Sequence, residues 1–202
     1  MSILMSGGSG LLGSELKKYL DLDAPSREEL DITKKITKKK KYDLIIHAAA
    51  YTNVDKAEVE IEKCFKTNIL GTVNLVEAYP NTPFVYISSE YVNRPINVYS
   101  YSKLAGEIIV EEKAKAYCII RTLFKEKPWR WAVAWLDQMT QGDYVDVIAK
   151  MMVDFIAEWD KKTSVKTFLG TGRKSMYDLA LKTNPRVKAV YYKRVKRPMD
   201  YL

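Results

Sequence analysis

Tyr99 and Lys103 are the two side chains whose spacing first indicates chemistry. They lie four residues apart in a segment with helical periodicity, which places the phenol and the ammonium on one face of a helix. A free tyrosine has a pKa of about 10, and a neighbouring ammonium lowers that pKa by favouring the phenolate. The pair suits proton transfer, although this spacing also arises by chance in a chain with 14 tyrosines.

Two hydroxyl side chains, Ser88 and Ser89, lie just upstream of this pair. They follow an apolar run over 84–87 that predicts a buried strand. Ligands of open α/β sheets bind at the carboxyl ends of the strands. A serine hydroxyl at this edge can therefore donate a hydrogen bond to a carbonyl oxygen while Tyr99 protonates the same oxygen.

The glycines Gly7, Gly10 and Gly13 fit the pattern G-x-x-G-x-x-G. They come directly after a short apolar strand expected over 2–5, and they open a helix-like stretch. Because glycine has no Cβ atom, a pyrophosphate can approach the backbone N–H groups of this run closely. The run therefore predicts a dinucleotide site. An ordinary tight turn is the alternative interpretation.

Arg27 bears on which dinucleotide the chain prefers. It follows a stunted second strand, expected around 20–24, at the point where an arginine can pair with a 2′-phosphate. This favours NADP(H), with NAD(H) as the alternative. The neighbouring Ser26 and Glu29 also fit a capping box, which is an equally good account of Ser26.

Alternating strands and helices predict the fold class, an α/β fold with a Rossmann-type doubly wound parallel sheet. We expect strands over 42–50, 84–87 and 117–120, and helices over 56–79 and 98–115 with Ile108 facing inward. The alternation falters after residue 121, although a helix over 145–159, a strand over 165–169 and a helix over 175–182 are still expected. We therefore divide the chain into an NAD(P)-binding domain over 1–121 and a reduced C-terminal cap over 122–202, packed on the same domain.

The composition and charge of the chain limit the kinds of partner that it can bind. The chain has 202 residues and a net charge of +8, and six of its lysines lie within 34–41. Neither this run nor the basic stretch over 182–197 carries a known nucleic-acid recognition motif, so we expect a solvated surface and not a nucleic-acid site. No stretch is long and apolar enough to predict a membrane span, and two distant cysteines argue against a disulfide framework. We expect a cytoplasmic protein.

The remaining candidates have structural interpretations that we favour. His47 is the only histidine, and we expect it to be hydrogen-bonded in the interior and not to act as a base. Trp131 and Trp135 are expected to pack on a helical face, with stacking on a nucleotide base as the alternative. Ser175 and Asp178 fit a capping box. No cluster of cysteine and histidine predicts a metal.

Several segments together resemble one family. They are the glycine run, 47–58 (HAAAYTNVDKAE), 67–72 (TNILGT), 88–92 (SSEYV) and 97–107 (NVYSYSKLAGE). In this order they resemble the extended short-chain dehydrogenase/reductases and, within them, most of all the dTDP-4-dehydrorhamnose reductases. The resemblance is strong over 1–121 and thinner after it.

This resemblance implies hydride delivery from a reduced nicotinamide to C4 of a 4-keto-6-deoxy sugar on a nucleoside diphosphate. It implies that Tyr99 is the proton donor, that Lys103 tunes it and binds the cofactor's ribose, and that Ser89 polarises the carbonyl. It further implies a homodimer and a set of binding residues: Gly7, Gly10, Leu11, Leu12 and Gly13 at the pyrophosphate, Asp31 and Ile32 at the adenine, Ala48, Ala49 and Ala50 along the cofactor, and Thr52, Val54 and Glu90 at the sugar.

The chain departs from the family on the substrate side. Only 93–96 remain of a usually longer loop, Leu123-Phe124 replaces the family's Ser-Trp, and the substrate region is much shortened. Two alternatives therefore stay open. One is a sugar-nucleotide epimerase or dehydratase of the same fold, and the other is a non-catalytic NADP-binding regulatory subunit.

Overall fold

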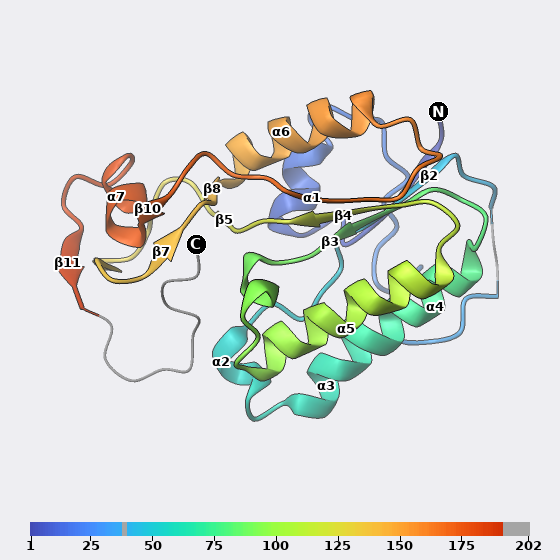
Figure 1. Ribbon diagram of the computed structural model, residues 1–202, viewed down its shortest axis with the longest axis horizontal. Coiled ribbons are helices and arrows are strands. Elements are labelled where there is room, and N and C mark those ends of the chain that lie inside the picture. The colour runs from blue at the N-terminus through green and yellow to red at the C-terminus, as the bar shows by residue number, and fades with distance from the viewer. Residues whose placement is uncertain (38–39, 192–202) are drawn as a thin grey trace.

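A five-stranded parallel sheet forms the centre of the molecule (Figure 1). The computed structural model describes residues 1–37 and 40–191. The strand order is β1-β2-β3-β4-β9, and every neighbouring pair is parallel, which confirms the predicted fold class. The strands are β1 (Ile3–Ser6), β2 (Leu44–His47), β3 (Phe84–Ile87), β4 (Tyr117–Arg121) and β9 (Val165–Phe168).

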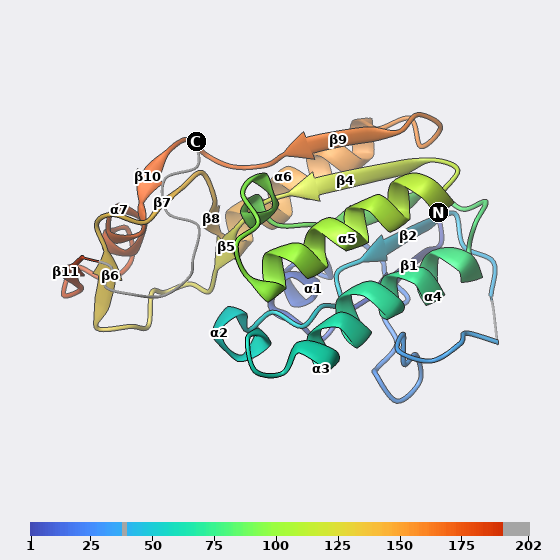
Figure 2. The same ribbon diagram turned by 60° about the horizontal axis from the view of Figure 1, so that its bottom comes forward.

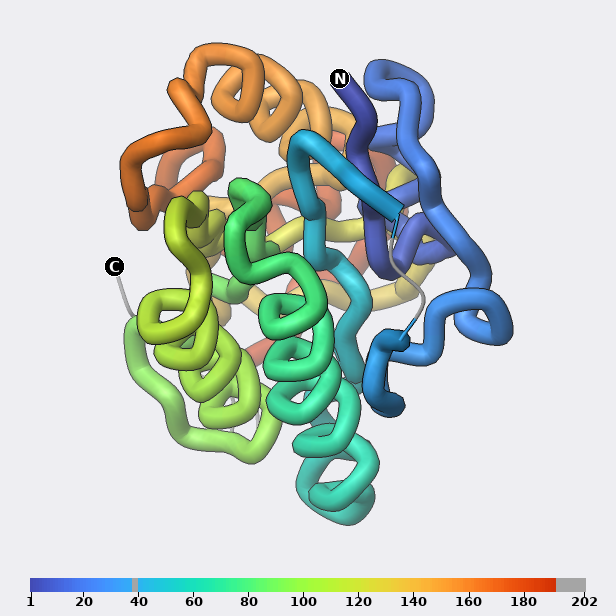
Figure 3. Tube along the Cα trace, turned by 90° about the vertical axis from the view of Figure 1, so that its right-hand side faces the viewer, coloured from blue at the N-terminus to red at the C-terminus, as the bar shows by residue number. Residues whose placement is uncertain are grey.

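Helices cover both faces of this sheet, because its strands are apolar on both sides. α1 (Leu11–Leu16) and α6 (Val145–Glu158) pack together on one face. The other face carries α3 (Ile61–Phe65), the π-helix η1 (Lys66–Leu70), α4 (Gly71–Ala78) and α5 (Val98–Lys113). Figure 3 shows α4 and α5 lying side by side beneath the sheet.

The helix expected over 56–79 is interrupted. A short α2 (Val54–Ala57) precedes α3, and the π-helix separates α3 from α4. Within the π-turn the Asn68 carbonyl accepts a 2.7 Å hydrogen bond from the Thr72 hydroxyl. A Cβ on Gly71 would come within 2.7 Å of the Ile32 side chain, so glycine permits close packing immediately after the π-turn. Ile108 of α5 is 52% exposed, so the expectation that it faces inward is wrong.

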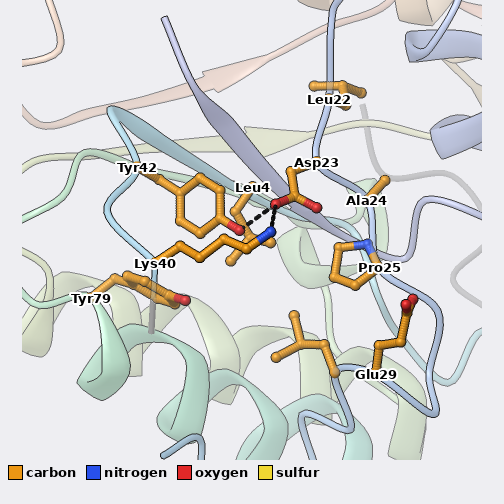
Figure 4. A pocket seen from close by; sticks show the side chains of 10 residues that line it. Leu4, Leu22, Asp23, Ala24, Pro25, Glu29, Lys40, Tyr42 and Tyr79 are labelled. Carbon is orange, nitrogen blue, oxygen red and sulfur yellow. Dashed lines mark hydrogen bonds and ion pairs between the residues drawn. The ribbon is translucent and has the colours of Figure 1, made fainter. Parts of the chain in front are cut away.

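The stunted second strand is present as a single parallel bridge between Leu4 and Asp23. No helix lies between Asp23 and β2 in the described part of this crossover, and a groove of about 490 Å³ opens beside the sheet (Figure 4). At its rim the Asp23 carboxylate accepts hydrogen bonds from the Tyr42 hydroxyl at 2.6 Å and Lys40 Nζ at 3.0 Å. This edge groove lies outside the predicted catalytic residues.

The cap is a small layer beyond the carboxyl ends of the strands (Figure 2). Its strands are short: β5 (Phe124–Lys125), β6 (Val133–Trp135), β7 (Met139–Thr140), β8 (Asp143–Tyr144), β10 (Lys174–Ser175) and β11 (Lys188–Val190). The single helix among its described residues is α7 (Met176–Leu181), which begins with the predicted capping box of Ser175 and Asp178. Since α6 and β9 belong to the sheet layers, the cap comprises 122–144 and 170–191.

Two expectations about the later part of the chain have different outcomes. Trp135 lies on β6, which pairs in parallel with β11, and Trp131 lies in the preceding loop. The expected packed helical face is therefore wrong: Trp131 is 40% exposed, while Trp129 is buried in the core of the cap. The basic stretch over 182–197 extends beyond the described residues, and so does part of the lysine run over 34–41.

Candidate functional site

Tyr99 and Ser89 meet where β3 ends and α5 begins, and Lys103 lies one turn further along α5. Ser89 caps the 3₁₀-helix η2 (Glu90–Asn93), and its Oγ accepts a 3.2 Å hydrogen bond from the Tyr91 N–H. The Ser89 hydroxyl is also hydrogen-bonded to the Tyr99 phenol. A capping box of Asn97 and Ser100 fixes the start of α5. Tyr99 and Lys103 then follow on successive turns, as the four-residue spacing predicts.

The pKa values of Tyr99 and Lys103 differ from those that their spacing alone predicts. Burial raises the pKa of Tyr99 to about 12, although the hydrogen bond with Ser89 works against this shift. Burial lowers the pKa of Lys103 to about 7, although Glu107 raises it. The expectation that the ammonium lowers the pKa of Tyr99 is not met, because burial is the largest cause of the shift and Lys103 is not among the groups that change this pKa. Tyr99 holds its proton at neutral pH, as a proton donor must.

Lys103 is enclosed by aromatic and polar groups. Its side chain is 3% exposed, and Nζ lies 4.1 Å from the centre of the Tyr86 ring, within range of a cation–π interaction. His47 is close enough for the charge of Lys103 to affect it, but burial is the larger cause that lowers the pKa of His47 to about 3. His47 bonds Ser6 Oγ through Nδ1 at 2.7 Å and Thr72 Oγ1 through Nε2 at 3.0 Å. The expected structural role of His47 is supported.

The glycine run forms a tight cradle at the end of β1. Gly7 has φ +82°, and a Cβ there would lie 2.6 Å from the Ala49 nitrogen. A Cβ on Gly13 would lie 2.5 Å from the Gly7 oxygen, whereas one on Gly10 would meet only that oxygen, at 3.2 Å. The backbone is therefore packed tightly behind Gly7 and Gly13, while the exposed Gly10 borders open space. This cradle fits a pyrophosphate. Of the next two residues, Leu11 is exposed and Leu12 is buried in the core.

The other residues expected along the cofactor come after the stunted strand and after β2. Ala48, Ala49 and Ala50 follow β2 and are half-buried. Ile32 is buried against Gly71, and Asp31 Oδ1 accepts hydrogen bonds from the Thr33 N–H at 3.0 Å and hydroxyl at 2.7 Å. Arg27 is exposed and lines a second groove, of about 470 Å³, whose other cationic lining residues are Lys63 and Lys66. Ser26 and Glu29 make the reciprocal hydrogen bonds of the capping-box pattern.

The three residues expected at the sugar have different surroundings. Thr52 is exposed, and Val54 is half-buried at the start of α2. Glu90 is 6% exposed and turns to the cap, where Oε2 accepts hydrogen bonds from Thr140 Oγ1 at 3.1 Å and the Gln141 N–H at 3.3 Å. Burial raises the pKa of Glu90, although these hydrogen bonds and two nearby lysines oppose the shift. Glu90 thus joins the sheet domain to the cap.

Asn68 is a positioning residue to which the sequence reasoning assigned no role. Its Oδ1 accepts a 2.7 Å hydrogen bond from the Tyr51 N–H, and its Nδ2 donates to Ser102 Oγ at 2.8 Å. Ser102 in turn donates to the Tyr99 carbonyl at 2.7 Å. Asn68 therefore ties the loop after β2 to the first turn of α5. No local signal marks it, because the π-turn that aims its side chain inward is not visible in the hydrophobic pattern.

Glu107 is the second such residue, and here a signal was present. It continues the spacing of Tyr99 and Lys103 by a further four residues, so it lies on the same face of α5. Its side chain is fully buried and is paired with Arg121. Across the described residues, the acidic, histidine and cysteine side chains form no group of three that could hold a metal ion, and no helix is long and apolar enough to span a membrane.

Comparison with known proteins identifies relatives. The sequence model of the family described as RmlD substrate binding domain matches residues 1–152. The dTDP-4-dehydrorhamnose reductase of Aggregatibacter actinomycetemcomitans is 33% identical over an alignment of 147 positions, and the match covers 59% of this chain and 50% of that protein. The enzyme of the same name from Mycolicibacterium smegmatis is 30% identical over an alignment of 176 positions, and the match covers 73% of this chain and 54% of that protein. The chain thus spans about half the length of these curated relatives.

Among solved structures, the dTDP-4-dehydrorhamnose reductase of Bacillus anthracis in complex with NADP is similar to this chain. The TM-score is 0.78 at 26% identity, and the match covers 97% of this chain and 88% of the other. The orthologue from Clostridium acetobutylicum has a TM-score of 0.83 at 24% identity and covers 100% and 88% of the two chains. At that identity the second likeness bears on the fold alone.

Proposed function

Because the chain belongs to the RmlD substrate binding domain family, we propose that it is an NADPH-preferring reductase of a nucleotide-linked 4-keto-6-deoxy sugar. The observation that supports this proposal is the hydrogen bond between the protonated phenol of Tyr99 and the hydroxyl of Ser89, with the buried amine of Lys103 one turn further along α5. The named relatives, and the one solved with NADP, support the choice of substrate and cofactor.

The reaction divides between the cofactor and the side chains. When bound, NADPH supplies the hydride that reduces the ketone carbon. Ser89 donates a hydrogen bond to the carbonyl oxygen, and Tyr99 transfers its proton to that oxygen as negative charge develops there. The products are an alcohol, NADP⁺ and a phenolate, which regains a proton from solvent. Protonated Lys103 stabilises the phenolate and binds the ribose hydroxyls.

The proposed cofactor residues come after β1, the stunted strand and β2 along the chain. The cradle of Gly7, Gly10 and Gly13 receives the pyrophosphate, with Leu11 and Leu12 opening the helix behind it. Asp31 and Ile32 flank the adenine, and the three alanines after β2 line the cofactor. Arg27 pairs with the 2′-phosphate. NAD(H) is the alternative, and Arg27 is the residue that favours the phosphorylated cofactor over it.

Turnover of NADPH tests the proposal. Absorbance of NADPH is followed with dTDP- and UDP-linked 4-keto sugars, and we expect its loss to be stoichiometric with a reduced sugar. Tyr99→Phe should lower kcat by roughly 10²- to 10⁴-fold while NADPH still binds, because only the transferable proton is removed. Tyr101→Phe is the matched control, since that side chain is 54% exposed. Normal turnover by Tyr99→Phe contradicts the proton-donor role.

The two alternatives have distinct outcomes in the same experiment. An epimerase or dehydratase changes the sugar without net consumption of NADPH. A regulatory subunit binds NADPH and turns over none of the sugars, and the short cap is the feature that favours it. We also propose a cytoplasmic location, which the buried free thiols of Cys64 and Cys118 support.

We propose that the chain forms a homodimer through α3 and α5. These two helices are in contact, and they expose the large apolar side chains of Phe65, Tyr101 and Ile108. Exposed apolar groups of this kind favour a protein contact when they lie together on one surface. Sedimentation equilibrium of the intact chain measures the state directly, and a monomer at all accessible concentrations contradicts the proposal.

A further inference from the structure

A buried ion cluster lies one helical turn beyond Lys103. Its centre is Glu107 of α5, whose side chain is 0% exposed. Arg121 at the end of β4 donates to both carboxylate oxygens, from Nε at 2.9 Å and from Nη2 at 2.7 Å. Lys166 of β9 approaches the second oxygen at 3.3 Å. A bidentate pair of this kind fixes the relative orientation of the guanidinium and the carboxylate as well as their distance. It therefore defines the position of α5 relative to β4 and β9.

The cluster also reaches the strand that carries the catalytic serine. Ser88, the residue before Ser89, donates a 2.6 Å hydrogen bond from Oγ to Glu107 Oε1. Arg121 uses its remaining Nη1 to donate to Asn93 Oδ1 at 2.9 Å, at the end of η2. Thus one carboxylate and one guanidinium hold both flanks of Ser89.

We propose that Glu107 is a positioning residue that fixes α5 against the end of β3, so that Tyr99 and Lys103 are held beside Ser89. This inference rests on the proposed function, because it concerns the geometry of the same reaction. Tyr99, Lys103 and Glu107 occupy successive turns on one face of α5, and a shift of α5 at Glu107 therefore moves all three together. A displacement of about 1 Å at reacting groups lowers rates by roughly 100-fold.

The charge of Glu107 has a second effect, on Lys103. Burial raises the pKa of Glu107, but hydrogen bonds from Arg121 and Ser88 outweigh it, so the carboxyl is ionised at neutral pH. This negative charge raises the pKa of Lys103. The other titratable groups that face the ammonium are Cys64 of α3, Tyr86 of β3 and His47 of β2, and Tyr99 lies one turn before it on α5. Of these, Tyr99, Tyr86 and His47 are neutral near pH 7, because burial moves their pKa values away from it.

Glu107→Gln separates positioning from a purely structural role. Glutamine keeps the length and planar shape of the side chain but removes the charge. At the pH optimum of each protein we expect kcat to be roughly 10- to 100-fold lower in the variant. We also expect the alkaline limb of the pH profile to move to lower pH, because Lys103 loses its proton more easily without the carboxylate. Stability that falls while kcat and the pH profile stay unchanged means that Glu107 only supports the fold, and the proposal is then wrong.

Glu111→Gln is the matched control. Glu111 lies one turn further along α5 and pairs with the same Lys166, at 2.6 Å. The substitution removes an equal charge without touching the Ser88 hydrogen bond, so we expect unchanged kcat and an unchanged pH profile. Equal effects of the two substitutions would assign the result to net charge and overturn the proposal.

A second pair of variants decides the case where Glu107→Gln does not fold. Ser88→Ala removes only the 2.6 Å hydrogen bond, and Ser88→Thr retains a hydroxyl. We expect Ser88→Ala to lower kcat without moving the alkaline limb, and Ser88→Thr to restore most of the rate. Wild-type kcat in Ser88→Ala contradicts positioning through Glu107.

The test also separates this inference from the proposed function. If the wild-type chain oxidises NADPH with none of the sugar nucleotides, the proposed function fails. The titration of Lys103, followed by NMR of its labelled side chain, then still tests the inference. It should move to lower pH in Glu107→Gln but not in Glu111→Gln, and an unchanged titration in both overturns it.

Discussion

The strands of the sheet and those of the cap are stabilised in different ways. β1 to β4 pair in parallel over three or four residues, and Leu44, Ile45 and Ile46 of β2 are fully buried. The strands of the cap are two or three residues long, and beside a small apolar core that includes Trp129 and Leu179 the cap buries the polar residues Gln138, Thr140, Asp143 and Ser175. Hydrogen bonds to buried polar groups therefore contribute more to the cap than to the central strands, whose burial is mainly apolar.

This difference bears on how far the cap can vary while the sheet stays the same. The glycine cradle and the proposed catalytic residues lie at the ends of strands and the start of helices in the sheet layers. The cap is joined to that edge by polar contacts such as Glu90 with Thr140, and by the hydrogen bond from Gln138 Nε2 to the Tyr91 hydroxyl at 3.0 Å. Directional contacts can change between relatives without disturbing the apolar core, so we infer that a short cap is compatible with an intact cofactor edge.

The largest expected effect is at Gly7. Gly7→Ala places a Cβ 2.6 Å from the Ala49 nitrogen on a backbone with φ +82°. We expect a loss of about 3 kcal/mol in the free energy of unfolding, from left-handed strain together with a clash against backbone atoms. NADPH binding should be lost as well, because the cradle must open to relieve the clash. Urea unfolding and fluorescence titration with NADPH measure the two effects.

Gly172→Ala in the cap is the matched control for this substitution. Gly172 has φ +90°, but a Cβ there would meet no atom within 4 Å. Only the backbone strain remains, about 1–2 kcal/mol, and NADPH binding should not change. Equal losses at the two glycines would mean that the cradle is less tightly packed than the structure shows.

The sequence predicts the features that depend on neighbouring residues, and it does not predict those that depend on residues far apart in the chain. Buried strands such as 84–87, the glycine turn and the spacing of Tyr99 and Lys103 are local patterns, and they predict the sheet and the catalytic face of α5. The pairing of β6 with β11 joins residues more than fifty positions apart, so the pattern around Trp131 and Trp135 gives no sign of it. Likewise, Glu90 turns to Thr140 because of a distant segment and not because of its own neighbours.

Burial of His47 in the sheet should make the stability of the folded chain sensitive to acid. His47 has a pKa of about 3 in the folded chain, because of its burial, against 6.5 when unfolded. Above pH 6.5 both states are neutral at this site and stability is unaffected. Below pH 6.5 the unfolded chain binds a proton that the folded chain rejects, so stability falls, by about 2 kcal/mol at pH 5.

His47→Asn should remove this part of the acid sensitivity. We expect the difference in unfolding free energy between pH 8 and pH 5 to be about 2 kcal/mol smaller in the variant than in the wild type. Wild type and variant share the same carboxylates, so the effect of these groups on stability cancels when the two pH differences are compared. Any loss of stability that the substitution causes equally at both pH values cancels as well. Identical differences in the two proteins would place the acid response elsewhere.

The smallest effect is expected in the cap, with the opposite sign. Burial raises the pKa of Glu90, so the folded chain binds a proton more readily than the unfolded chain, and stability is lost as pH rises through the folded pKa. Glu90→Gln removes the buried charge but keeps an oxygen that accepts from Thr140 and the Gln141 N–H. Proteolysis within 122–144 should therefore be slower in the variant than in the wild type at pH 8, and the difference should shrink as the pH falls.

Glu126→Gln is the control for this measurement, because Glu126 belongs to the same segment and pairs with Arg130 on the surface. Its charge is already hydrated, so we expect an unchanged rate of proteolysis at every pH. Faster cleavage of Glu90→Gln at pH 8 would show that the Glu90 charge stabilises the cap through Lys125 and Lys174, which both lower its pKa. In that case ion pairing, and not hydrogen bonding to a desolvated carboxyl, holds the cap on the sheet.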